Sequence, residues 1–178
     1  MRRFGRCCSL LLLGVLCSLN GQAQTFRLQT ESDSLSWLVL ESDSTRDGWR
    51  LPYPVYQFQV GDVDGDGKPD AMVGVVKKTR FYREKGRRLF IFKNHRGKVR
   101  PLWMGSKLGG NLVDFRYRDG QIRALETGSD GRFTITDYHW EEFGLAFSRF
   151  IAKNINQKTI AYEKFLDDNA GSADEPCD

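Results

Sequence analysis

Four aspartates crowd into one nine-residue stretch, 62–70, which reads DVDGDGKPD. They occupy its first, third, fifth and ninth positions and are Asp62, Asp64, Asp66 and Asp70. Carboxylates so close together repel one another unless a positive charge lies among them. Gly65 and Gly67 accept positive φ angles, which lets the backbone curl and turn alternate side chains inward. The spacing therefore predicts a turn that wraps a cation.

The donor chemistry of this turn favours Ca²⁺. Calcium accepts about six to eight hard oxygen ligands in flexible geometry, whereas Mg²⁺ demands a stricter octahedron. The main-chain carbonyl of Lys68, at the seventh position, is a natural further ligand. The stretch is not an EF-hand, because Val73 occupies the twelfth position, where that loop carries a glutamate. The alternative is a metal-free acidic hairpin held by Asx turns. No acid–base groups accompany the stretch, so we expect a structural metal rather than a catalytic one.

A second stretch, 77–88, is basic and reads KKTRFYREKGRR. Its cations are Lys77, Lys78, Arg80, Arg83, Lys85, Arg87 and Arg88. Phe81 and Tyr82 lie between them, a pattern that suits the binding of an anionic polymer such as a sulfated or uronic-acid polysaccharide. The alternative is a solvated hairpin loop between two strands, which is the interpretation we favour.

Large aromatic residues offer a sugar-stacking platform built from Trp37, Trp49, Trp103, Trp140, Tyr53 and Tyr56. In an all-β chain such residues more often pack in the core, and we adopt that interpretation. His95 and His139 have no partner spacing for zinc or a catalytic triad. Glu141 and Glu142 suggest a glycosidase carboxylate, but adjacent residues on a strand point to opposite faces, whereas a catalytic pair must face each other across a cleft.

The segments that position these residues are predicted to be strands almost throughout. Short runs rich in β-branched and aromatic residues, separated by turn residues, are 36–41, 55–60, 71–76, 88–93, 111–117, 121–126, 132–138 and 145–151. Asp119-Gly120 predicts a type I′ hairpin, and 94–97 and Asp130-Gly131 predict further turns. The segment 157–166 fits either a last helix or a last strand.

A faint internal repeat groups these strands. Residues 56–103 and residues 111–147 each read as a meander of four strands, and residues 26–49 fit a unit that lacks its first half. A four-stranded meander repeated at roughly 45 to 55 residues is typical of propeller blades. The prediction is an all-β, propeller-like domain over 24–166 with two to three blades, too few to close a ring. A stand-alone β-sandwich with the acidic loop as an insertion is the alternative.

The acidic stretch, followed at once by the apolar run AMVGVV, resembles the calcium-binding loop of FG-GAP/VCBS-type repeats, as in integrin-like β-propellers. In that family the loop joins the first two strands of a blade, and calcium ties the turn together. The resemblance implies that the ligands are Asp62, Asp64, Asp66, the main chain of Lys68 and Asp70. It covers about 20 residues. The second unit has YRDGQIR at 117–123 in place of the acidic loop, which implies that it binds no metal.

The chain begins with the features of a secretory signal peptide, residues 1–23. A basic start precedes an apolar run too short to span a bilayer, and Gly21 and Ala23 precede a cleavage site before Gln24. The sequence therefore predicts no transmembrane segment and export to the periplasm, the cell surface or the medium. Cys17 raises the alternative of a lipoprotein anchor, which the bulky Leu16 before it disfavours.

Removal of this peptide changes the charge and cysteine content. Three of the four cysteines leave with it, so the mature chain, with only Cys177, is expected to have no internal disulfide. Three arginines and no acids leave as well, so the formal net charge falls from +4 to +1. That balance argues against nucleic acid as a partner. The acidic tail, 167–178, is predicted to be disordered.

These features predict a secreted calcium-binding module for a protein partner or a surface glycan. An incomplete set of blades leaves sheet edges that invite pairing with a partner, including a second copy of the chain. The alternative is an extracellular polysaccharide lyase or hydrolase that uses calcium to hold its substrate. Paired acids facing a groove would support the enzyme, and an apolar end face would support the binding module.

Overall fold

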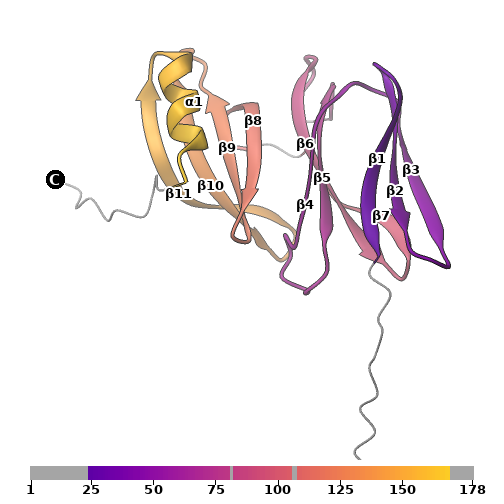
Figure 1. Cartoon of the computed structure of the whole chain (residues 1–178). Coiled ribbons are helices and arrows are strands. Elements are labelled where there is room, and N and C mark those ends of the chain that lie inside the picture. Colours follow the sequence, from indigo (N-terminus) through magenta and orange to yellow (C-terminus); the bar gives the residue numbers. More distant parts are fainter. Residues whose placement is uncertain (1–23, 81, 106–107, 169–178) are drawn as a thin grey trace, which may run out of the picture.

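The computed structural model describes residues 24–80, 82–105 and 108–168, which form eleven strands and one helix (Figure 1). The predicted signal peptide with its three cysteines lies outside the described residues. So do Phe81 and the predicted tail from residue 169 on. No helix of the described part has the length and apolar character needed to cross a membrane.

The strands form three antiparallel sheets in which sequence neighbours pair. The N-terminal sheet contains β1 (Thr25–Ser32), β2 (Leu35–Glu41) and β3 (Arg46–Leu51). The middle sheet contains β4 (Val55–Gly61), β5 (Asp70–Lys77), β6 (Gly86–His95) and β7 (Lys98–Met104). The C-terminal sheet contains β8 (Asn111–Arg118), β9 (Gln121–Thr127), β10 (Phe133–Glu141) and β11 (Gly144–Ile155). Helix α1 (Lys158–Leu166) follows.

The sheets stand side by side in an open row, with the middle sheet packed against both others (Figure 1). The all-β prediction is therefore confirmed, and each predicted unit corresponds to one sheet. Three stacked sheets differ from the two of a sandwich. Within the described residues the row does not close into a ring.

Local turn chemistry explains the tight hairpins. Asp119 and Gly120 both have positive φ, 47° and 77°, as a type I′ turn between β8 and β9 requires. Arg96 and Gly97 repeat this pattern between β6 and β7, with φ of 54° and 76°. These turns twist with their strands and fix the pairing register on both sides.

Apolar clusters fill the two spaces between the sheets. Ala71, Val73 and Val75 of β5 belong to the cluster shared with the N-terminal sheet, while Met72 belongs to the cluster shared with the C-terminal sheet. Because β5 is buried on both faces, its sequence is a continuous apolar run rather than an alternation.

Helix α1 covers the outer face of the C-terminal sheet. Ala161 and Phe165 of the helix pack on Leu125 of β9 and Ile135 of β10. The segment whose sequence fitted a helix or a strand is thus a helix. The outer face of the N-terminal sheet instead carries exposed polar side chains such as Gln29 and Glu31. The outer face at one end of the row is therefore covered by a helix, whereas the outer face at the other end is exposed.

Candidate metal centre

The acidic stretch forms the connection between β4 and β5. Gly61 and Asp70 form the last residue pair between β4 and β5, so the loop begins and ends at the same edge of the hairpin. Gly65 and Gly67 have φ of 73° and 79°, which supplies the predicted curl. The hairpin of the middle sheet therefore positions the loop at one end of the molecule.

Three of the four predicted carboxylates come together. Ligand oxygens of Asp62, Asp64 and Asp70 lie within 4.8 Å of one another, close enough to share one metal ion. Asp70 is only 1% exposed. One oxygen of Asp62, Oδ1, is buried and has no hydrogen-bond partner among the residues that the structure describes. A buried carboxylate oxygen left without a donor is unfavourable, and a bound cation would satisfy it.

Backbone amides hold the carboxylates in place. Asp70 Oδ2 accepts from the amides of Val63 at 3.0 Å and Asp64 at 3.4 Å. Asp62 Oδ2 accepts from the amide of Gly67 at 2.8 Å. Asx-type bonds run from the Asp66 amide to Asp64 at 3.3 Å and from the Lys68 amide to Asp66 at 2.9 Å. The loop thus has two features at once: the local Asx-type bonds expected of a metal-free hairpin, and a cluster of carboxylates.

Lys93 of β6 is the residue that sequence reasoning missed. Its ammonium group donates to Asp64 Oδ2 and lies 3.4 Å from Asp66 Oδ2. It reaches the loop because β6 lies beside β5, where Ala71 pairs with Phe92, the neighbour of Lys93. Lys93 therefore supplies part of the positive charge that the crowded aspartates require.

Asp66 and Lys68 differ from the other predicted ligands. Asp66 is turned toward the ammonium groups of Lys93 and of Lys68, whose Nζ lies 3.8 Å away, and it is not one of the three clustered carboxylates. A role for the Lys68 carbonyl stays a prediction.

Tyr117 supports the loop from the neighbouring sheet. Its hydroxyl donates to the main-chain carbonyl of Asp62 at 2.8 Å. Its ring fills the space beside Gly61, where an added Cβ would come within 2.2 Å of a ring carbon. A larger residue at position 61 would therefore displace Tyr117 and the start of the loop.

Burial and hydrogen bonding change the pKa values of Asp70 and Lys93. Burial, aided by the Asp64 charge, raises the pKa of Asp70 to about 6 against the opposing hydrogen bond from the Val63 amide. The hydrogen bond to Asp64 raises the pKa of Lys93. A divalent cation among the carboxylates would favour their charged forms.

The basic stretch, hereafter the basic hairpin (residues 77–88), divides into two groups in space. The packed group lies on aromatic rings: Lys77 on Tyr53 at 4.4 Å, Arg87 on Tyr56 at 4.5 Å and Arg88 on Tyr82 at 4.1 Å. The exposed group lies at the hairpin tip and comprises Lys78, Arg80, Arg83 and Lys85. The second group is the more accessible of the two to a ligand.

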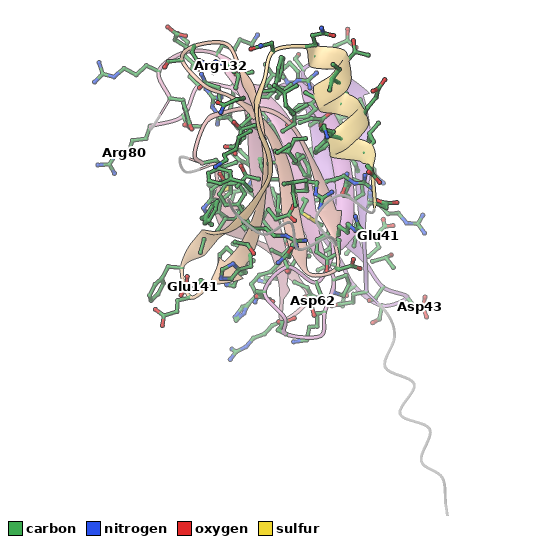
Figure 2. The ribbon with its side chains drawn as sticks, turned by 90° about the vertical axis from the view of Figure 1, so that its left-hand side faces the viewer. Glu41, Asp43, Asp62, Arg80, Arg132 and Glu141 are labelled. Carbon is green, nitrogen blue, oxygen red and sulfur yellow. The ribbon has the colours of Figure 1, made fainter. Side chains whose placement is uncertain are left out.

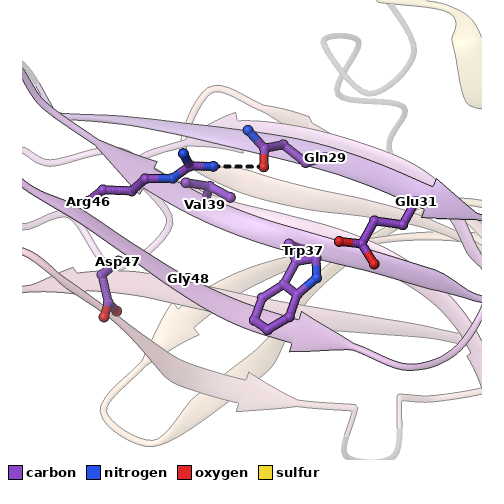
Figure 3. Close-up of a pocket in the computed structure, with 7 residues that line it drawn as sticks. All are labelled: Gln29, Glu31, Trp37, Val39, Arg46, Asp47 and Gly48. Atoms are coloured by element: carbon purple, nitrogen blue, oxygen red, sulfur yellow. Dashed lines mark hydrogen bonds between the residues drawn. The ribbon is translucent and has the colours of Figure 1, made fainter.

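The aromatic residues considered as an alternative for a sugar-stacking platform are dispersed. Trp49 packs on Phe92 inside the N-terminal cluster, and Trp103 is 7% exposed. Trp37 instead lies on the outer face of the N-terminal sheet, beside Gly48 and a shallow depression of about 370 Å³ (Figure 3). Arg46 there already donates to Gln29 at 2.9 Å.

His139 and the glutamates near it do not form a buried metal or catalytic site. His139 Nε2 lies 4.0 Å from Glu141, and both side chains are largely exposed. Glu142 has a positive φ of 40° in the turn between β10 and β11. Among the described residues, the only cluster of histidine, cysteine or acidic side chains close enough to share a metal is that of Asp62, Asp64 and Asp70.

Comparison with known proteins gives no relative for this chain: no protein-family model, curated protein or solved structure matched it.

Proposed function

We propose that the chain is a secreted, calcium-binding, propeller-like repeat protein that acts as a binding module for a protein partner or a surface glycan. The observation that carries the calcium assignment is the buried Asp62 Oδ1, which clusters with Asp64 and Asp70 and lacks a donor within the described part of the chain. The meander sheets, with the acidic loop between the first two strands of the middle one, support the propeller-like description.

Calcium fits this donor set better than other common metals. All the clustered ligands are hard carboxylate oxygens, and no cysteine or histidine lies among them. Lys93 neutralises the side of the loop that faces Asp64 and Asp66. An ion bound to the cluster would complete the neutralisation on the Asp62 side.

A binding role fits the loop better than the alternative role in a polysaccharide-active enzyme. The carboxylates are fixed by backbone amides and by Lys93, and Asp70 is almost fully buried. Such groups stabilise a turn, whereas a substrate-bridging calcium needs open coordination positions.

Thermal unfolding of the purified full-length chain, in EDTA and across a calcium titration, tests the assignment. Calcium at about 100 times its Kd stabilises a protein by about 2.7 kcal/mol, so Tm should rise by several degrees. Asp62→Asn preserves the shape of the side chain and should abolish the rise. Asp119→Asn is the matched control, because Asp119 occupies the equivalent hairpin of the C-terminal sheet and its side chain is 89% exposed.

A calcium-dependent rise in wild type and Asp119→Asn, absent in Asp62→Asn, would support the site. No rise in a folded wild-type protein, or an equal rise in all three proteins, would contradict it.

A further inference from the structure

A pocket of about 300 Å³ opens in the C-terminal sheet, at its β9–β10–β11 side. We call it the end pocket. Its lining residues come from the glycines before β8, the end of β9, and strands β10 and β11. Its volume is at the lower limit of small-molecule sites, so it suits one sugar ring rather than a large ligand.

Buried polar groups line the end pocket. Glu126 is 2% exposed, Thr136 1% and Tyr138 5%. The Tyr138 hydroxyl donates to Glu126 at 2.9 Å, and the amides of Gly109 and Gly110 donate to Tyr138 at 3.0 Å and to Glu126 at 2.8 Å. This network fixes acceptor oxygens before any ligand arrives, an arrangement that suits the hydroxyl donors of a sugar.

A β-bulge places two aromatic rings at the rim. Phe150 pairs with Thr136 and Phe147 with Tyr138, so β11 has one extra residue between them. Both phenylalanines therefore lie on the face that carries Thr136 and Tyr138. Their ring centroids are 4.8 Å apart, and the residues are 49% and 51% exposed. Half-exposed rings beside fixed polar groups offer an apolar face for the C–H face of a pyranose.

The basic hairpin lies next to the end pocket. The Tyr82 hydroxyl donates to the carbonyl of Gly110, a residue that lines the pocket, at 3.3 Å. Arg80 at the hairpin tip and Arg132 before β10 project from the same end of the molecule, whereas Asp62 lies at the opposite end (Figure 2). The Lys153 ammonium lies 4.8 Å from the Phe150 ring centroid, so the rim itself is cationic.

We propose that the end pocket and the exposed group of the basic hairpin form one binding face for an anionic polysaccharide. The proposal rests on the binding function proposed above and names its ligand class. One sugar ring occupies the pocket, with its hydroxyls on Glu126 and Tyr138 and its apolar face on Phe147 and Phe150. Carboxylate or sulfate groups of adjoining sugars lie against the exposed cations.

Isothermal titration calorimetry on the full chain in EDTA tests this face. The probes are an oligogalacturonide, a heparin oligosaccharide and a neutral cello-oligosaccharide of equal length. We expect an anionic probe to bind, the neutral one to bind more weakly, and the affinity to fall as salt rises. The two anionic probes distinguish a uronate from a sulfated ligand.

Paired variants separate the two parts of the face. Phe147→Ala with Phe150→Ala should weaken binding about tenfold through lost stacking. Arg80→Gln with Arg83→Gln should weaken binding of the anionic probe about tenfold and reduce its salt dependence. Phe143→Ala, at a 90% exposed residue in the β10–β11 turn, and Arg27→Gln with Arg50→Gln, at exposed residues of the N-terminal sheet, are controls that should leave the affinity unchanged.

Binding of no probe, equal binding of the neutral probe, or an affinity unchanged in both variant pairs would overturn the proposal. A repeat of the titration in calcium completes the test: binding seen only there, and lost in Asp62→Asn, would place the glycan on the acidic loop and also overturn the proposal. Failure of the calcium titration alone would leave this face intact, because the measurement is made in EDTA.

Discussion

We expect Lys93 to connect the stability of the acidic loop to its proposed affinity for calcium. Its ammonium group bonds to Asp64 and lies 3.4 Å from Asp66, with 24% of the side chain exposed. Lys93→Gln removes this charge and leaves the clustered carboxylates less compensated. We expect the variant to be less stable in EDTA by about 1 kcal/mol. Saturating calcium should recover that loss, so the calcium-induced rise in Tm should exceed that of wild type.

Lys68→Gln provides the control for Lys93. Lys68 lies 3.8 Å from Asp66 but its side chain is 62% exposed, so its removal should scarcely change Tm in EDTA. If Lys93→Gln lost stability and calcium restored none of it, Lys93 would be the sole counter-charge of the loop, against the calcium proposal.

Asp137 is expected to stabilise the fold through its ion pairs with two arginines. Its carboxylate accepts from Arg123 at 2.9 Å and from Arg149 at 3.2 Å, and both Asp137 and Arg123 are 2% exposed. Asp137→Asn leaves the Arg123 guanidinium buried beside a neutral amide. We expect a loss of about 3 to 5 kcal/mol in the free energy of unfolding, measured by urea denaturation.

Asp130→Asn is the comparison for that loss. Asp130 pairs with Arg132 at 3.0 Å, but both side chains are half exposed, so the change should stay below about 1 kcal/mol. Similar losses of unfolding free energy in the two variants would show that burial of the Asp137–Arg123 pair does not determine how much the pair stabilises the fold.

The clustered aspartates could be predicted because the whole loop is local in sequence. Asp62, Asp64 and Asp70 are brought together by the turn that their own glycines permit. Lys93 and Glu126 could not be predicted. Lys93 lies 29 residues from Asp64, and the hydrogen-bond partners of Glu126 are Gly110, which precedes β8, and Tyr138 of β10. Such placements depend on strand register, which one sequence does not specify residue by residue.

Helix α1 is the element with the clearest packing role. Phe165 is 3% exposed and packs with Leu125 and Ile135 on the outer face of the C-terminal sheet. Phe165→Ala should lower the free energy of unfolding by about 3 kcal/mol through lost burial and the cavity left behind. Ile160→Ala, at a residue 38% exposed on the same helix, should lower it by less than about 1 kcal/mol.

Equilibrium denaturation of both helix variants tests that role, with far-ultraviolet circular dichroism as the probe. An equal small effect of the two changes would mean that the helix is not part of the cooperative fold.

At the scale of elements, strands were easier to predict than the helix. The central strands have β-branched and aromatic runs, and the Asp119-Gly120 turn has its own chemistry. Helix α1 has only nine residues, and Gln157 forms no side-chain cap. Its helical state depends on the apolar sheet face that it covers, together with Arg116, which donates to the carbonyls of Phe165 and Leu166. Neither partner is visible in the local sequence.

At the scale of the whole molecule, the repeat predicted the sheets but not their contacts. The apolar run of β5 indicates burial on both faces, yet which sheet covers which face follows from packing across the row. The acidic loop precedes β5 and the basic hairpin follows it, so the length of this strand places them at opposite ends of the molecule (Figure 2). The row therefore presents an end with the acidic loop and a basic end, and the proposals for the two ends can be tested independently.

Because the stacking of sheets buries tyrosines, we expect the fold to be sensitive to alkali. Burial raises the pKa of Tyr53, which packs on Phe90, to about 12. It raises those of Tyr56 and Tyr138 further still. Because the unfolded tyrosines ionise near pH 10, the stabilisation is complete below that pH and is lost as pH rises through 12. We expect tyrosinate absorbance and loss of circular dichroism to rise together in one transition above pH 10.

Tyr56→Phe identifies the residue behind this transition. The Tyr56 hydroxyl is buried without a partner among the described residues, and its ring packs edge-on to Phe115 of the C-terminal sheet. The phenylalanine preserves the packing between the two sheets and cannot ionise, so the alkaline midpoint should move to higher pH. Gradual ionisation near pH 10 in a protein that keeps its circular dichroism would contradict the argument, because it would show that these hydroxyls are already solvated in the folded row.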